Sequence, residues 1–186
     1  LNRLDMSKIA DEANQLCEKW RALPTPRVAV LLGGDNRRYD ISAIMAKDMA
    51  NRLANFATKT GASLALIPSR RTPATLITQL TAALEPLPYA VMDQAENNPY
   101  PGILGLVDAV IVTSDSVNMI SEATITGLPI LIAEWQNETG RIGAFHDAMM
   151  AAGHIAPMRD QLPQDGFTPL EEMPAIVKSV LARLHS

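Results

Sequence analysis

Five short apolar runs recur along the chain, and none of them alternates between apolar and polar residues. Continuous apolar runs of this length are typical of strands that are buried on both faces, as in a parallel sheet. The stretches between the runs carry apolar residues at helical spacing. This order predicts an α/β fold, a doubly wound, Rossmann-like parallel sheet of five or six strands. The runs are residues 27–33, 63–68, 89–92, 108–113 and 129–133.

Helices are predicted at both ends of the chain as well as between the runs. Residues 4–20 carry an apolar stripe that includes Cys17, which we expect to pack in the core. Residues 170–185 carry a stronger stripe, and the prolines of residues 157–169 predict a loop before it. Between the first two runs, the predicted helix has a stripe made of Ile41, Ile44, Met45, Met49, Leu53 and Phe56.

Composition limits the class of protein. The chain has 186 residues, 47% apolar residues and a net charge of −4, which excludes intrinsic disorder and argues against nucleic-acid binding. We interpret residues 1–186 as a single Rossmann-like domain with flanking helical segments at residues 1–22 and 157–186. The lone cysteine cannot form an internal disulfide and favours a cytoplasmic location, with a peripheral membrane position left open. No apolar run is long enough for a transmembrane segment.

Two arginine doublets follow the ends of the first two predicted strands, namely Arg37 with Arg38 and Arg70 with Arg71. In open α/β sheets, ligands bind beyond the carboxyl ends of the strands, where the strand order reverses. If the two strands are neighbours, both doublets lie at one edge, and their guanidinium groups match phosphate oxygens. The doublets therefore predict a phosphate-bearing ligand, with arginines solvated in ordinary loops as the alternative.

The loop after the first run contains two adjacent glycines, Gly33 and Gly34, followed by Asp35. Glycine permits positive φ and lets the backbone approach a ligand closely. The loop is neither a dinucleotide fingerprint nor a Walker A motif. A tight turn after a strand is the alternative interpretation.

The loop after the fourth run consists of Thr113, Ser114, Asp115 and Ser116, and a predicted helix follows it. Free N–H groups at a helix start can bind a phosphate or a diphosphate. Helix capping alone would also explain Asp115 or Ser116. A carboxylate in this loop repels phosphate unless an arginine of the first doublet offsets its charge.

Glu122 lies further along the same helix, four residues after Asn118 and away from the apolar stripe of that helix. Its carboxylate could accept hydrogen bonds from both hydroxyls of a ribose while the helix start holds the phosphates. A solvated glutamate on the helix surface is the alternative that the sequence alone favours. His146 is predicted near the start of a later helix, within reach of the same cleft.

Residues 115–129 resemble the nucleotide-sugar binding segment of GT-B glycosyltransferases, in which a small polar loop opens a helix, a Glu follows, and Gly-x-Pro leads into the next strand. More closely, residues 25–155 resemble the mitochondrial-fission "elongated mitochondria" family of plants and its bacterial relatives. Four pieces in matching order make this resemblance specific, and the segment around Phe145 also fits. The four pieces are residues 30–39, 68–73, 96–100 and 113–129.

The resemblance implies a GT-B-like fold of which this chain is the C-terminal, Rossmann-like half. It implies a nucleoside-diphosphate sugar as the substrate, no separate cofactor, a ribose contact by Glu122 and a diphosphate at the loop of Ser114 to Ser116. The expected partner is a missing N-terminal half, or a second copy of this chain, and no catalytic residue is assigned. The candidate ligand-binding residues are Gly33, Gly34, Asp35, Arg37, Arg38, Ser69, Arg70, Arg71, Ser114, Asp115, Ser116 and Glu122.

Three functions compete on this evidence. The first is the donor-binding half of a glycosyltransferase, in which the protein stabilises charge on the departing nucleoside diphosphate. The second is a non-catalytic adaptor in membrane, organelle-division or cell-division processes, because a fold does not determine a function. A nucleotide-sugar epimerase is disfavoured, since the chain has neither a glycine-rich dinucleotide motif nor a Tyr-x-x-x-Lys pair. No set of residues has metal-ligand spacing, so no metal site is predicted.

Overall fold

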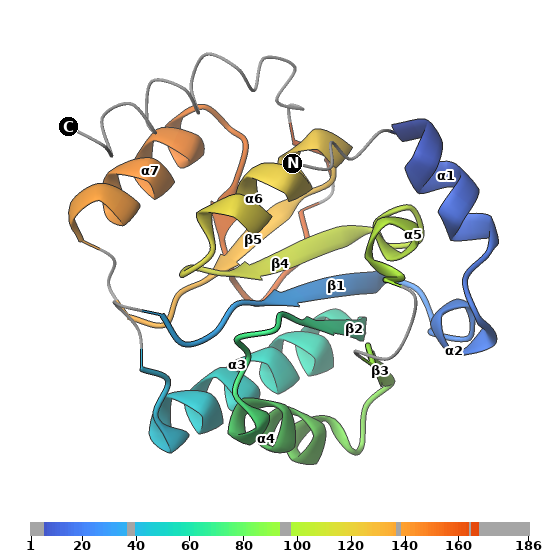
Figure 1. Cartoon of the computed structure of the whole chain (residues 1–186), viewed down its shortest axis with the longest axis horizontal. Helices are drawn as coiled ribbons and strands as arrows, with labels where there is room; N and C mark the ends of the chain where they lie inside the picture. The colour runs from blue at the N-terminus through green and yellow to red at the C-terminus, as the bar shows by residue number, and fades with distance from the viewer. Residues whose placement is uncertain (1–5, 37–39, 94–97, 137–138, 164, 168–186) are drawn as a thin grey trace.

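The computed structural model describes residues 6–36, 40–93, 98–136, 139–163 and 165–167. These residues form one six-stranded sheet in the order β3-β2-β1-β4-β5-β6, and every neighbouring pair is parallel (Figure 1). The predicted doubly wound parallel sheet is therefore confirmed. The strands are β1 Arg27–Leu32, β2 Ser63–Pro68, β3 Tyr89–Val91, β4 Ala109–Thr113, β5 Ile130–Ala133 and β6 Ala156–Pro157.

The short strand β6 overlaps the predicted loop of residues 157–169 at its second residue, Pro157. Its residues Ala156 and Pro157 pair with Leu131 and Ile132 of β5. The N–H of Met158 continues the ladder by donating to the carbonyl of Ile132 at 2.9 Å. Two residues are too few to establish an apolar pattern, so this strand is recognisable only from its pairing with β5.

Helices cover both faces of the sheet, with α3 and α4 on one face and α5, α6 and α7 on the other (Figure 1). Strand β1 contributes to both apolar layers. Val28, Val30 and Leu32 belong to the cluster beneath α3 and α4, whereas Ala29 and Leu31 belong to the opposite cluster. The helices are α1 Met6–Asn14, α2 Glu18–Arg21, α3 Ala43–Thr60, α4 Ala74–Leu84, α5 Tyr100–Leu104, α6 Val117–Ala123 and α7 Gly140–Ala151.

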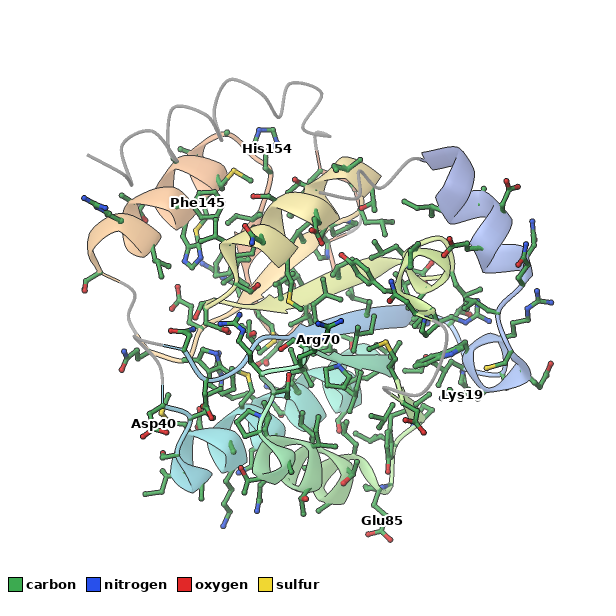
Figure 2. All side chains as sticks on the ribbon, viewed as in Figure 1. Lys19, Asp40, Arg70, Glu85, Phe145 and His154 are labelled. Atoms are coloured by element: carbon green, nitrogen blue, oxygen red, sulfur yellow. The ribbon has the colours of Figure 1, made fainter. Side chains whose placement is uncertain are left out.

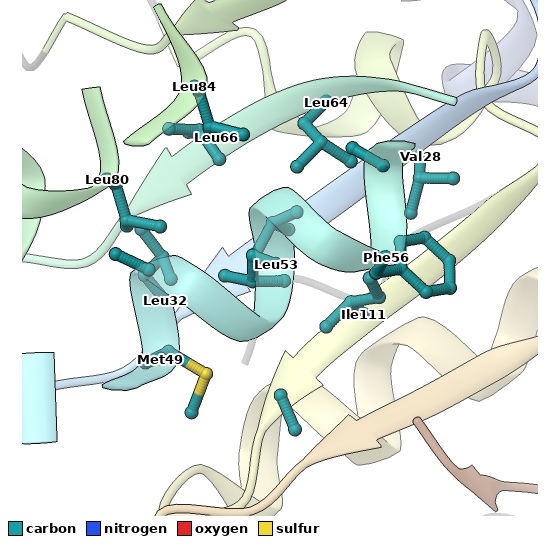
Figure 3. Packing of buried hydrophobic residues seen from close by; sticks show 14 of the residues in the cluster. Val28, Leu32, Met49, Leu53, Phe56, Leu64, Leu66, Leu80, Leu84 and Ile111 are labelled. Carbon is teal, nitrogen blue, oxygen red and sulfur yellow. The ribbon is translucent and has the colours of Figure 1, made fainter. Parts of the chain in front are cut away.

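The layer beneath α3 and α4 is densely apolar (Figure 3). Leu53 and Phe56 of α3 are almost completely buried against the sheet, as are Leu80 and Leu84 of α4. Burial of each such side chain stabilises the fold by about 1.5–3 kcal/mol relative to exposure. The helix stripes predicted between the strands thus form the core, except at one position.

That position is Ile44, whose side chain is 83% exposed. The buried face of α3 runs through Ala46, Met49 and Leu53. Ile44 precedes Ala46 by two residues, which corresponds to about 200° around the helix axis, so it points away from the core. The prediction that Ile44 belongs to the buried stripe is wrong.

The predicted N-terminal helix is divided into α1 and α2. Cys17 lies between them as the extended N-cap residue of α2, and its side chain is exposed. The expected core position of Cys17 is therefore wrong, because the helix break turns it outward. Trp20 of α2 is completely buried instead. The helix predicted over residues 170–185 lies outside the described residues.

Candidate functional site

The strand order reverses at β1, which pairs with β2 on one side and with β4 on the other. The loops that follow β1, β2 and β4 therefore emerge at the same carboxyl edge of the sheet. The sequence predicts that the loops of residues 33–38, 69–72 and 113–116 meet at one edge, and this is confirmed for the described residues 33–36, 69–72 and 113–116. Arg37 and Arg38, the first predicted doublet, lie outside the described residues.

The loops after β1 and β2 are bonded directly to each other. The N–H of Asp35 donates to the carbonyl of Arg71 at 3.1 Å. The hydroxyl of Thr72 reaches the carbonyls of Leu32 at 2.9 Å and Gly33 at 2.6 Å, and the N–H of Ser69 donates to the same Leu32 carbonyl at 3.0 Å. These bonds hold the second arginine doublet beside the glycine loop.

The side chains of Arg70 and Arg71 are exposed at this edge, while Ser69 is half-buried. Figure 2 labels Arg70, on the loop between β2 and α4. The hydroxyl of Ser69 lies 3.1 Å from that of Thr72 and accepts from the N–H of Arg71 at 3.3 Å. Ser69 therefore organises the turn, and the two guanidinium groups remain in contact with solvent.

The carboxylate of Asp115 connects the loops after β1, β4 and β5. It accepts one hydrogen bond from the N–H of Gly34 at 3.0 Å and one from the indole Nε1 of Trp135 at 2.8 Å. Asp115 is only 8% exposed. Because its two carboxylate oxygens accept hydrogen bonds from two neighbouring loops, Asp115 holds these loops together. The sequence did not predict this role.

Thr113, the last residue of β4, and Ser114, which follows it, make similar connections with their side chains. The hydroxyl oxygen of Thr113 accepts from the N–H of Gly33 at 2.8 Å, and that of Ser114 accepts from the N–H of Trp135 at 3.2 Å. Thr113 and Ser114 are completely buried. The polar character of this loop is thus used largely in joining β4 to β1 and β5.

The two glycines after β1 are required by crowding. Gly33 and Gly34 are absent from the described glycines that have positive φ, so the conformational freedom of glycine is not what these two positions use. A Cβ on Gly33 would lie 2.0 Å from a carboxylate oxygen of Asp115, and one on Gly34 would lie 1.9 Å from the carbonyl oxygen of Arg71. The loops after β2 and β4 can pack this closely only against a backbone without side chains.

Ser116 is the N-cap residue of α6, and its side chain makes no cap hydrogen bond. The capping alternative for Asp115 and Ser116 is therefore wrong: Asp115 binds Gly34 and Trp135, and the Ser116 hydroxyl makes no cap bond. Ser116 is 7% exposed. The start of α6 therefore directly follows Asp115, in the buried part of the candidate site.

Glu122 is half-buried, and burial raises the pKa of its carboxyl group. Asn118, on the same side of α6, is exposed. Glu122 is therefore less exposed than the alternative of a solvated surface glutamate implies, whereas Asn118 is exposed. A partly desolvated carboxylate at this position is suited to accept hydrogen bonds from a ligand.

Tyr100, the first residue of α5, is a functional candidate that the sequence reasoning did not single out. Its hydroxyl oxygen is buried and has no hydrogen-bond partner among the described residues. The pKa of its phenol is raised first by burial and second by the negative charge of Glu122. The available sequence signal was its place at the end of residues 96–100, one of the pieces that carry the family resemblance.

His146 does not lie at a helix start. It is the seventh residue of α7, is 2% exposed and contacts the ring of Phe145 with 5.8 Å between centroids. The expectation that it stands at the entrance of the helix is wrong, because α7 already begins at Gly140. In the part of the chain that the structure describes, no group of three or more His, Cys, Asp or Glu side chains is placed to hold a metal ion.

The fold and these three connected loops define a Rossmann-like α/β domain with a candidate ligand site at the reversal of its strand order. The chain belongs to the mitochondrial fission ELM1 family, because the model of that family matches residues 1–184. This confirms the family resemblance read from the sequence. No helix of the described residues is both long and apolar enough to cross a membrane.

Two relatives support the assignment. The chain is 30% identical over 174 residues to mitochondrial fission protein ELM1 of Arabidopsis thaliana, an alignment that covers 93% of this chain and 38% of the plant protein. It is 31% identical over 107 residues to the uncharacterized protein RP120 of Rickettsia prowazekii, covering 56% of this chain and 30% of the bacterial protein. The alignments thus span about a third of the length of either relative.

Proposed function

We propose that this chain is the nucleotide-binding part of a protein of the mitochondrial fission ELM1 family and that it binds a nucleoside diphosphate or its sugar conjugate. The observation that carries the proposal is the reversal of strand order between β1 and β4. Ligands of open α/β sheets bind at this point of the fold. The GT-B-like interpretation of the sequence names the same edge.

The charges at this edge favour a phosphate ligand. Arg70 and Arg71 are exposed, and their loop is bonded to the glycine loop. Ser114 and Asp115 are engaged between loops, so in this proposal they shape the site and the arginines contact the diphosphate. Glu122 contributes the carboxylate for the ribose. The acceptor and the catalytic base are supplied from outside this set of residues.

Titration calorimetry tests the proposal with UDP, ADP, GDP, CDP and inorganic diphosphate. The double variant Arg70→Ala/Arg71→Ala should bind nucleotide and inorganic diphosphate about tenfold more weakly, because both ligands lose the guanidinium contacts. Glu122→Gln should weaken nucleotide binding alone. Arg21→Ala removes an exposed arginine at the opposite edge of the sheet and serves as the matched control. Equal binding by the arginine double variant and the control would refute the phosphate site.

A non-catalytic adaptor is the second candidate function. The observation that favours it is the use of Thr113, Ser114 and Asp115 in bonds between loops, which leaves few polar side chains of this edge for a substrate. The plant relative is named for mitochondrial fission. Absence of binding by all four nucleotides and by inorganic diphosphate would favour the adaptor over the nucleotide-binding domain.

A further inference from the structure

Asp35 places an exposed carboxylate at the edge of the sheet where the proposed function puts a phosphate-bearing ligand. A negative charge at this edge repels phosphate and lowers its affinity, and the effect is largest at low salt. The presence of an acid beside two exposed arginines therefore needs a structural reason. The hydrogen bonds of Asp35 supply one, because they connect two different segments of the chain.

The first segment is the chain that enters α3. One carboxylate oxygen of Asp35 accepts from the N–H of Ile41 at 2.9 Å. The Ile41 side chain is 5% exposed and belongs to the apolar cluster beneath α3 and α4. The next residue, Ser42, is the N-cap of α3 and accepts from the N–H of Met45 at 3.3 Å. Ile41 is therefore held by the core and by the helix start, and the side chain of Asp35 is tied to it.

The second segment is the arginine loop, residues 69–72. The backbone N–H of Asp35 donates to the carbonyl of Arg71 at 3.1 Å. The hydroxyl of Thr72 attaches the end of the loop to β1 and the residue after it, whereas the bond from Asp35 reaches an arginine itself. The contact is close, because a Cβ on the neighbouring Gly34 would lie 1.9 Å from the same carbonyl oxygen. Asp35 thus joins the arginine loop to the start of α3.

We propose that Asp35 is a positioning residue of the phosphate site. Its side chain, held by Ile41, orients its backbone N–H toward the carbonyl of Arg71, and its carboxylate does not contact the ligand. This inference rests on the proposed function, for which it names the residue that fixes the arginine loop. The acceptor oxygen of Asp35 then strengthens phosphate binding, and its negative charge weakens it.

Two uncharged replacements separate these effects in titration calorimetry with inorganic diphosphate and with the tightest-binding of UDP, ADP, GDP and CDP. Asp35→Asn removes the charge but keeps an acceptor oxygen for the N–H of Ile41, so both ligands should bind about threefold more tightly. Asp35→Ala also removes the acceptor, so both ligands should bind about threefold more weakly than to the unaltered chain. The increase in Asp35→Asn should shrink at high salt, because salt screens the repulsion.

Glu85 provides the matched control for the loss of an acidic side chain (Figure 2). It is exposed and follows the last residue of α4. Because β2 and β3 are parallel, α4 returns the chain to the amino edge of the sheet, away from the candidate site. Glu85→Gln and Glu85→Ala should both leave the affinities for the two ligands unchanged.

Two results would overturn the inference. Weaker binding to Asp35→Asn than to the unaltered chain would mean that the carboxylate contacts the ligand directly. Equal affinities of Asp35→Asn and Asp35→Ala would mean that this side chain acts through its charge alone.

Failure of the proposed function has a separate signature in amide hydrogen exchange, which NMR measures without any ligand. The protection factors of the N–H groups of Ile41 and of residue 35 should fall about tenfold in Asp35→Ala and stay unchanged in Asp35→Asn. If this pattern is found and no ligand binds, the proposed function is refuted and the positioning of Arg71 by Asp35 is supported. Unchanged protection in Asp35→Ala overturns the inference, whether or not a ligand binds.

Discussion

Replacement of Asp115 by alanine should destabilise the fold strongly, although Asp115 follows the strand in a loop. The carboxylate accepts from the N–H of Gly34 and from the indole of Trp135. Hydrogen bonds to a charged group contribute about 1.5–3 kcal/mol each, and a buried donor without a partner carries a further cost. Partial entry of water offsets some of that cost. We expect Asp115→Ala to lower the free energy of unfolding by about 3–5 kcal/mol.

Urea denaturation followed by tryptophan fluorescence measures this effect, since Trp135 is one of two tryptophans in the chain. Asp115→Asn should lose about half as much stability as Asp115→Ala, because its amide has one acceptor oxygen and faces the second donor with an NH₂ group. Asp160→Ala is the control, because it removes an exposed carboxylate that pairs with Lys59, an interaction worth about 0–1 kcal/mol. If the free energy of unfolding of Asp115→Ala falls within about 1 kcal/mol of that of the control, Asp115 does not hold the loops together.

Two other predictions concern the glycine loop and Glu122. Gly34→Ala should lower the free energy of unfolding, measured by urea denaturation, by more than about 1–3 kcal/mol, because its Cβ would lie 1.9 Å from the backbone of Arg71. The control Gly61→Ala, at φ +69° in open space, should lower it by only about 1–2 kcal/mol through backbone strain. Equal losses in the two variants would contradict the crowding argument. Because burial raises the folded-state pKa of Glu122, the folded chain binds this proton more tightly than the unfolded chain, and stability falls as pH rises through that pKa. Glu122→Gln should therefore be more stable than the unaltered chain at pH 7 and equal to it below the ordinary carboxyl pKa of 4.5, and the same stability difference at both pH values would contradict this reasoning.

Much of the fold could be predicted because buried parallel strands carry their signal locally. β1, β2, β4 and β5 are continuous apolar runs, and any arrangement that buries them on both faces requires helices on both sides. The candidate edge was predictable for the same reason, since parallel strands place all their following loops together. Ile44 and Cys17 were misplaced because helical spacing identifies a stripe but not where a helix breaks or which turn leaves the core.

The chemical role of each loop residue was not predictable from its type. From the sequence, Asp115 could equally be a helix cap or part of a phosphate site. Its role in holding the loops together depends on hydrogen bonds from Gly34 and Trp135, which lie 81 and 20 residues away along the chain. Gly33 and Gly34 similarly owe their identity to neighbours on other loops.

Local apolar patterns are enough to predict the layers of this protein, the direction of its strands and the edge at which its polar loops lie. Which polar groups hydrogen-bond to one another, and which have no partner, depends instead on contacts between segments that are far apart along the chain. The Tyr100 hydroxyl, for example, is buried without a hydrogen-bond partner among the described residues, and this depends on packing that no local pattern encodes.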